Sequence, residues 1–131
     1  EALRGRSHGV LAEATQRSCA IKAEVVAQDE REGGLRAILN FGHTFAHAIE
    51  QVMGYGVWLH GEAVACGMVM AAKISAARGH ISNDTAAQLA QFLVSFDLPV
   101  KPPSEMSAAV FLNAMAGDKK VVRMEWLGSD A

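Results

Sequence analysis

The sequence predicts an all-α fold, and three observations support this class. Apolar residues recur at three- and four-residue spacing in five separate segments, which is the period of an amphipathic helix. No segment alternates convincingly between apolar and polar residues, as a half-buried strand does. The glycine-rich phosphate loop GxGxxG of a nucleotide-binding α/β fold is missing too. With 131 residues, the chain has the length of one helical domain with a real core.

The first helix is predicted over residues 11–28, where Leu11, Ile21 and Val25 belong to one stripe. The glycine pair in "DEREGG" ends it. A second helix is predicted over residues 35–53 or part of them, and "GYG" stops it with residues that favour a tight turn.

The third predicted helix, residues 61–78, is rich in alanine and methionine, which is typical of a buried central helix. Gly79 follows it as a C-terminal cap. Ser82 or Asn83 is expected to cap a fourth helix that runs to about residue 96. After the extended connector "LPVKPP", Ser104 is expected to cap a fifth helix through residue 116.

Composition argues against two classes of partner. The formal charge of −2 comes from 12 basic and 14 acidic side chains without long runs, so neither a nucleic-acid face nor a membrane-surface patch is predicted. No apolar run reaches the length of a membrane span, and the first residues lack the order of a signal peptide. Cys19 and Cys66 lack metal-finger spacing and lie in apolar, helix-like segments, which indicates reduced core thiols in a cytoplasmic protein.

A polar stripe interrupts the second helical segment. Arg36, Asn40, His43 and His47 follow one another at spacings of four, three and four, so a continuous helix carries them on one face. A histidine pair at this spacing can chelate a metal, but it is more often a hydrogen-bonded core or surface feature. The whole stripe, lying among aromatic residues, favours an anionic or metallic partner over a solvated face.

A third histidine, His60, lies in "GYGVWLHGEAVACGM", where a turn meets the central helix. With His43 it offers two nitrogen ligands from adjacent helices, one fewer than the three protein ligands of a catalytic zinc. Glu50 and Glu62 are the nearby acidic candidates. Glu62 falls in the first turn of a predicted helix, where the helix dipole favours it for structural reasons.

Two stretches, "LRAILNFGHTFAHAIE" and "GYGVWLHGEAVACGMVMAA", closely resemble 3-dehydroquinate synthase. The resemblance spans residues 21–79 and continues more weakly through "DKK" at 118–120. Members of that family have an N-terminal NAD-binding α/β domain and a C-terminal helical domain, with substrate and a divalent metal, typically zinc, between them. The resemblance implies that residues 1–131 are a single helical domain of a larger enzyme, lacking the NAD-binding domain. Residues 121–131 depart from the family pattern.

The resemblance implies roles for the histidines. His43 and His60 match two of the three metal ligands, and the third, a glutamate, belongs to a segment upstream of this chain. His47 and Asn40 match residues that face the substrate phosphate, and His47 is expected to assist proton movement during phosphate loss.

The resemblance also implies roles for the cationic residues. Lys22 and Arg36 match residues that hold the substrate carboxylate, which suits a guanidinium fork and a point charge. Lys119 or Lys120 is expected to approach the phosphate, although an adjacent lysine pair after a helix is usually solvated.

The implied reaction converts 3-deoxy-D-arabino-heptulosonate 7-phosphate to 3-dehydroquinate and phosphate. It proceeds through transient oxidation by NAD, β-elimination, reduction and an intramolecular aldol step. The implied partners are this sugar phosphate, the N-terminal domain and a second copy of the protein. Two alternatives remain: a related cyclase whose substrate lacks a carboxylate, and a non-catalytic helical module that assembles with another chain.

Overall fold

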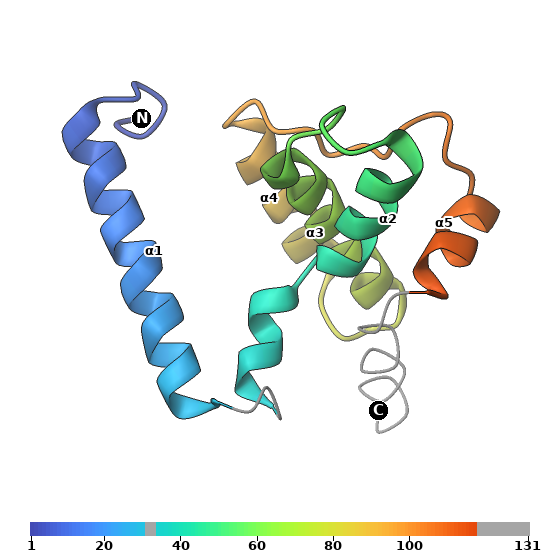
Figure 1. Ribbon diagram of the computed structural model, residues 1–131, viewed down its shortest axis with the longest axis horizontal. Coiled ribbons are helices and arrows are strands. Elements are labelled where there is room, and N and C mark those ends of the chain that lie inside the picture. Colours follow the sequence, from blue (N-terminus) through green and yellow to red (C-terminus); the bar gives the residue numbers. More distant parts are fainter. Residues whose placement is uncertain (31–33, 118–131) are drawn as a thin grey trace. The chain divides into compact units, whose positions relative to one another are not determined.

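The computed structural model describes residues 1–30 and 34–117, and within them the all-α prediction is confirmed (Figure 1). The helices are α1 (His8–Gln28), the 3-10 helix η1 (Leu35–Asn40), α2 (His43–Met53), α3 (His60–Ala77), α4 (Asn83–Val94) and α5 (Ala108–Met115). None of these described helices combines the length and apolar character that a bilayer span needs. The chain divides into two compact units, Glu1–Asn40 and Phe41–Ala131, called the first and the second unit below.

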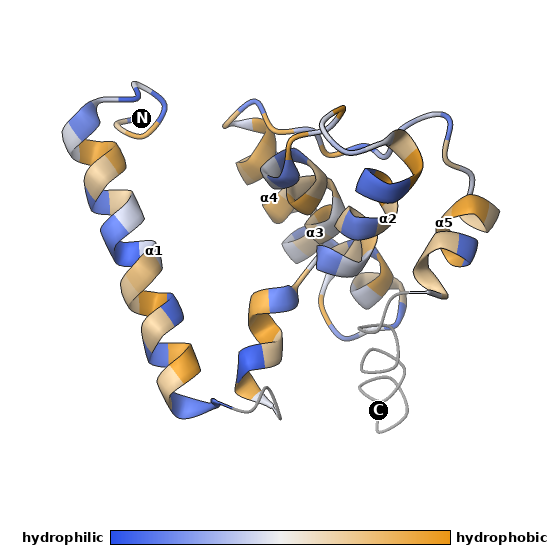
Figure 2. Ribbon diagram, viewed as in Figure 1, coloured by the Kyte–Doolittle hydropathy of each residue, from blue (hydrophilic) through white to orange (hydrophobic). Residues whose placement is uncertain are grey.

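In the first unit, α1 begins three residues before the predicted start and ends, as predicted, at Gln28. Figure 2 shows hydrophobic and hydrophilic residues mixed along its whole length, and among its residues Val25 is the buried one. The Asp29 carboxylate then accepts the backbone N–H groups of Gly34 at 2.7 Å and Arg36 at 3.0 Å. This side chain therefore fixes where η1 starts after α1.

The second predicted helix is interrupted. Gly42 adopts φ 80°, a left-handed conformation that residues with a Cβ rarely take. Its carbonyl accepts the first hydrogen bond of α2, from Ala46 N–H at 3.0 Å. Because η1 ends at Asn40 and α2 starts at His43, the predicted continuous face from Arg36 to His47 is wrong.

A close approach of backbones joins α2 to α3. A Cβ built on Gly67 would lie 2.1 Å from the carbonyl oxygen of Gly42, and one on Gly42 would lie 2.5 Å from Met68 N. No side-chain carbon fits at either distance. The start of α2 therefore rests directly on the middle of α3, and two glycines make this contact possible.

The core of the second unit surrounds α3. This agrees with the prediction of a buried central helix. Helix α3 packs against α2 and α4, and α5 packs against α2. Phe45 of α2 meets Phe111 of α5 edge to face, with ring centres 6.3 Å apart. The main cluster of buried residues consists of Phe45, Ala46, Ala48, Ile49, Ala63, Cys66, Ala71, Met106 and Phe111.

The two cysteines differ. Cys66 is buried as predicted, whereas Cys19 of α1 is exposed, so its prediction as a core residue is wrong. Burial raises the pKa of the Cys66 thiol from 9.0 to about 11, against a smaller opposing effect from the charge of Lys73.

The caps of the last two helices confirm one prediction and correct another. The Ser82 hydroxyl accepts the N–H of Thr85 at 3.0 Å and caps α4, as expected. Helix α5 is capped by Ser107, whose hydroxyl accepts the N–H of Val110 at 3.3 Å. The predicted cap Ser104 is therefore wrong by one turn. Residues 118–131, including Lys119, Lys120 and the tail 121–131, lie outside the described residues.

Candidate functional site

Three histidines of the second unit lie together. His43 is the first residue of α2, His47 follows one turn later, and His60 is the first residue of α3. The ring centres of His43 and His47 are 5.9 Å apart, and those of His43 and His60 are 5.5 Å apart. The Gly42–Gly67 contact brings the start of α2 onto α3, so the cluster depends on helix packing as well as on sequence spacing.

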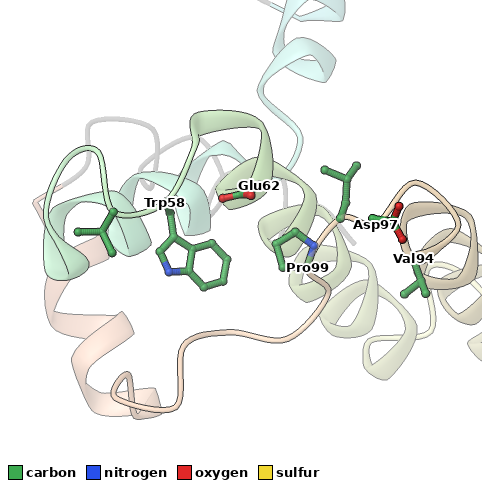
Figure 3. A pocket seen from close by; sticks show the side chains of 7 residues that line it. Trp58, Glu62, Val94, Asp97 and Pro99 are labelled. Carbon is green, nitrogen blue, oxygen red and sulfur yellow. The ribbon is translucent and has the colours of Figure 1, made fainter. Parts of the chain in front are cut away.

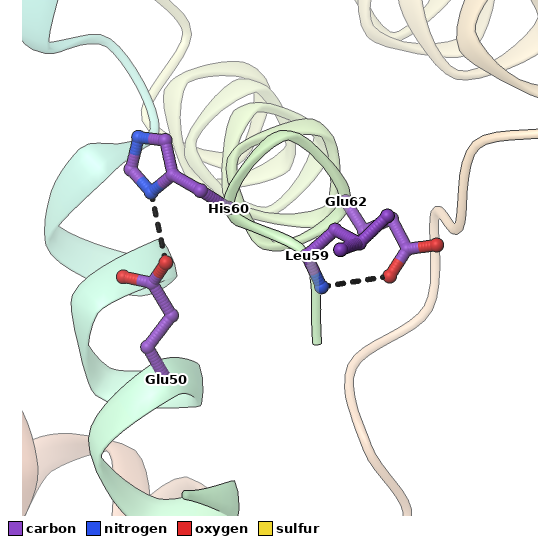
Figure 4. Close-up of polar contacts among 4 residues, drawn as sticks. All are labelled: Glu50, Leu59, His60 and Glu62. Atoms are coloured by element: carbon purple, nitrogen blue, oxygen red, sulfur yellow. Dashed lines mark hydrogen bonds and ion pairs between the residues drawn. The ribbon is translucent and has the colours of Figure 1, made fainter. Parts of the chain in front are cut away.

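The start of α3 has its own support, drawn in Figure 4. Leu59 precedes the helix in an extended conformation, and its backbone N–H donates to the Glu62 carboxylate at 3.0 Å. An acidic side chain in the first turn also complements the helix dipole. The structural interpretation of Glu62 is confirmed, and this cap holds the backbone next to His60.

His60 has a carboxylate partner from the neighbouring helix. Its Nδ1 lies 2.8 Å from Oε1 of Glu50 (Figure 4). The Glu50 side chain is 13% exposed and that of His60 is 60% exposed. The sequence indicates Glu50 as a nearby acidic candidate but does not predict this contact. The available signal was the short "GYG" turn, which lets the end of α2 and the start of α3 meet.

The nitrogen donors suit a metal ion. A metal held by two imidazole nitrogens at about 2.0 to 2.1 Å, with a tetrahedral angle, places the ring centres roughly 5 Å apart. The His43–His60 separation of 5.5 Å matches this spacing. Within residues 1–30 and 34–117, no three His, Cys, Asp or Glu side chains converge as a complete ligand set. The two rings therefore fit part of a metal site that needs a further ligand.

The other predicted residues belong to the first unit. Lys22 lies exposed on α1, and Arg36 and Asn40 lie partly exposed on η1. The Arg36 guanidinium donates to the carbonyl oxygen of Glu30 at 3.0 Å. These three residues and the histidines belong to different units, and their meeting stays a prediction. The same holds for Lys119 and Lys120, outside the described residues.

A surface pocket of about 530 Å³ lies elsewhere on the second unit (Figure 3). Its described lining combines apolar side chains with two carboxylates and consists of Val57, Trp58, Glu62, Val94, Asp97, Leu98 and Pro99. Of the residues considered for the site, Glu62 lines this pocket, whereas His43, His47 and His60 do not. The nitrogen donors lie in the histidine cluster and not in this pocket.

Comparison with known proteins places the chain in the class of helical C-terminal parts of a synthase. The family described as "3-dehydroquinate synthase C-terminal" matches residues 1–121. The chain belongs to this family, and the resemblance seen in the sequence is confirmed.

Two curated relatives support the assignment. The chain is 55% identical over 119 residues to "3-dehydroquinate synthase" of Hydrogenovibrio crunogenus (strain DSM 25203 / XCL-2), covering 91% of the chain and 33% of the relative. It is 56% identical over 122 residues to "3-dehydroquinate synthase" of Pseudomonas putida (strain W619), covering 93% and 33%. The chain thus spans about a third of the length of these relatives.

Proposed function

We propose that this chain forms the helical metal- and substrate-binding part of a 3-dehydroquinate synthase. The reaction converts 3-deoxy-D-arabino-heptulosonate 7-phosphate to 3-dehydroquinate and phosphate. The observation that carries the proposal is the meeting of His43, His47 and His60 at the starts of two packed helices, in a chain of this family. The proposal includes NAD bound by an upstream domain, a second copy of the protein as partner and a cytoplasmic location.

In this proposal His43 and His60 hold a divalent metal, most simply zinc, and an upstream glutamate completes the set. A metal held there would supply polarisation of the substrate oxygen, and NAD held by the upstream domain would supply the hydride exchange. The two rings come from α2 and α3, which approach each other closely where Gly42 and Gly67 meet. This chain would thus contribute two nitrogen donors from packed helices.

His47 has a different task. It lies one helical turn after His43, partly exposed beside the metal-binding ring. From there it faces the substrate phosphate together with Asn40 and moves a proton as the phosphate leaves, for which an imidazole is suited near neutral pH.

Lys22 and Arg36 neutralise the substrate carboxylate, and Lys119 or Lys120 approaches the phosphate. Removing one charged hydrogen-bond partner typically costs about 1.5 to 3 kcal/mol, so Arg36→Ala should raise KM for the heptulosonate roughly 10- to 100-fold. Arg36→Lys should recover only part of this loss, since lysine lacks the planar fork.

Phosphate release by the full-length protein that contains this chain tests the proposal. The heptulosonate 7-phosphate should be turned over, and sedoheptulose 7-phosphate, which has no carboxylate, should not. Arg17→Ala is the matched control, because Arg17 pairs with Glu13 on the exposed face of α1 at 2.6 Å. Preference for the sedoheptulose phosphate, unchanged by Arg36→Ala, would make the protein a related cyclase instead.

A further inference from the structure

We propose that Glu50 is a positioning residue for the metal site. It holds the His60 imidazole with the proton on Nδ1, so that Nε2 is the nitrogen offered to the metal. This inference rests on the proposed function, because it assumes that His60 binds a metal. It adds a residue from the opposite helix that touches neither the metal nor the substrate.

The contact itself determines the tautomer. An ionised carboxylate can only accept hydrogen bonds, so at 2.8 Å the His60 Nδ1 must carry the proton that it donates to Glu50. In the neutral ring the lone pair then lies on Nε2. Histidine ligands commonly donate their second ring nitrogen to a carboxylate in this way.

The position of Glu50 makes this contact more than a surface ion pair. Its side chain is 13% exposed, and a carboxylate so far removed from water needs a hydrogen-bond donor. Glu50 lies in α2 and His60 in α3, and these two helices pack closely against each other. The carboxylate is therefore held in place and can fix the orientation of a ring that is itself 60% exposed.

His43 shows a parallel arrangement. Its Nδ1 faces the carbonyl oxygen of Phe41 at 3.4 Å, and a carbonyl also only accepts. In both rings Nδ1 therefore faces an acceptor. For His60 this is the Glu50 carboxylate of α2, and for His43 it is the Phe41 carbonyl just before α2. The two nitrogens assigned to the metal are consequently the Nε2 atoms, on rings whose centres are 5.5 Å apart.

The experiment measures zinc affinity by competition with a chelator, in the full-length protein and three variants. Loss of such an outer carboxylate typically costs 10- to 100-fold in metal affinity, so Glu50→Ala should raise the zinc Kd by that factor. Glu50→Gln, which retains an acceptor without the charge, should show a smaller rise. Glu62→Gln is the matched control: it removes a carboxylate that supports the backbone beside His60, and its Kd should stay within about threefold of the parent.

A second measurement separates positioning from general damage to the fold. Nitrogen-15 spectra of the metal-free protein should show His60 protonated on Nδ1 in the parent, and a mixture of tautomers in Glu50→Ala. A parent that binds zinc while Glu50→Ala binds it equally well would overturn this inference and leave the proposed function standing. A parent that binds no zinc would overturn both. Protonation on Nε2 in the parent would contradict the inference by itself.

Discussion

The two units of the chain use their helices in opposite ways. In the first unit, the 21-residue α1 has Val25 as its buried residue. In the second unit, the 18-residue α3 buries seven residues, four of them alanines. Helix α3 contacts neighbours through small side chains and one bare glycine, whereas α1 keeps apolar side chains such as Ile21 exposed.

The two units therefore differ in how far tertiary packing stabilises their helices. An isolated helix is marginal in water, and most helical stability in proteins comes from packing an apolar face. The second unit has that packing, and its histidines stand on it. The first unit carries its proposed substrate residues on helices with much less burial. Substitutions matched between the two units should therefore have very different effects.

The largest contrast concerns glycine. Gly67→Ala places a Cβ 2.1 Å from the carbonyl oxygen of Gly42, which only a shift of backbone can relieve. We expect it to lower the free energy of unfolding by more than about 4 kcal/mol, measured by denaturant titration. Gly9→Ala in α1 meets nothing within 4 Å and should leave stability unchanged or raise it by up to about 1 kcal/mol. Equal changes in the free energy of unfolding for the two variants would contradict the close approach of α2 and α3.

A pair of isoleucines sharpens the comparison. Ile49 of α2 is fully buried, and Ile21 of α1 is 60% exposed. Ile49→Ala should cost about 2 to 5 kcal/mol, because it leaves a cavity, whereas Ile21→Ala should stay within about 0.5 kcal/mol. Thermal unfolding of both variants provides the measurement. A large loss with Ile21→Ala would mean that α1 is covered in the folded protein.

The cysteines give the smallest contrast, and it depends on pH. Iodoacetamide at pH 8 should modify exposed Cys19 and spare Cys66, whose pKa is raised to about 11 by burial. Since the folded state keeps this thiol protonated, its contribution to stability is complete below about pH 9 and is lost as pH rises through about 11. Cys66→Ala should remove this part of the alkaline destabilisation. Equal alkylation of both thiols would contradict the burial of Cys66.

The sequence predicts helices better than it predicts where they break. Period-3.6 patterns are local, so all five helical segments could be recognised. Gly42 lies within such a pattern, and neither its left-handed conformation nor its close approach to Met68, which is remote in sequence, can be read from that pattern. Ser104 and Ser107 are equally good caps by type. The bond from Met106 N–H to the Pro103 carbonyl forms a turn first, which moves the start of α5 to Ser107.

The candidate site also has contacts that the sequence predicts and contacts that it does not. The i, i+4 spacing of His43 and His47 places both rings on one face of α2, so this meeting could be predicted. The Glu50–His60 contact links residues ten positions apart on two packed helices. The short "GYG" turn brings the ends of these helices close together, but it does not specify which side chains meet. Asn40 was expected on the same face as the histidines, and the break at Gly42 removes that argument.

The most direct test of the account is zinc content in the full-length protein after substitution of each histidine. His43→Ala and His60→Ala should abolish zinc retention and turnover together, because each removes a nitrogen ligand of the proposed metal site. His47→Ala should keep the metal while slowing phosphate release, since its assigned task is proton movement. Loss of zinc from His47→Ala, with zinc retained by His60→Ala, would contradict the division of roles among the three histidines.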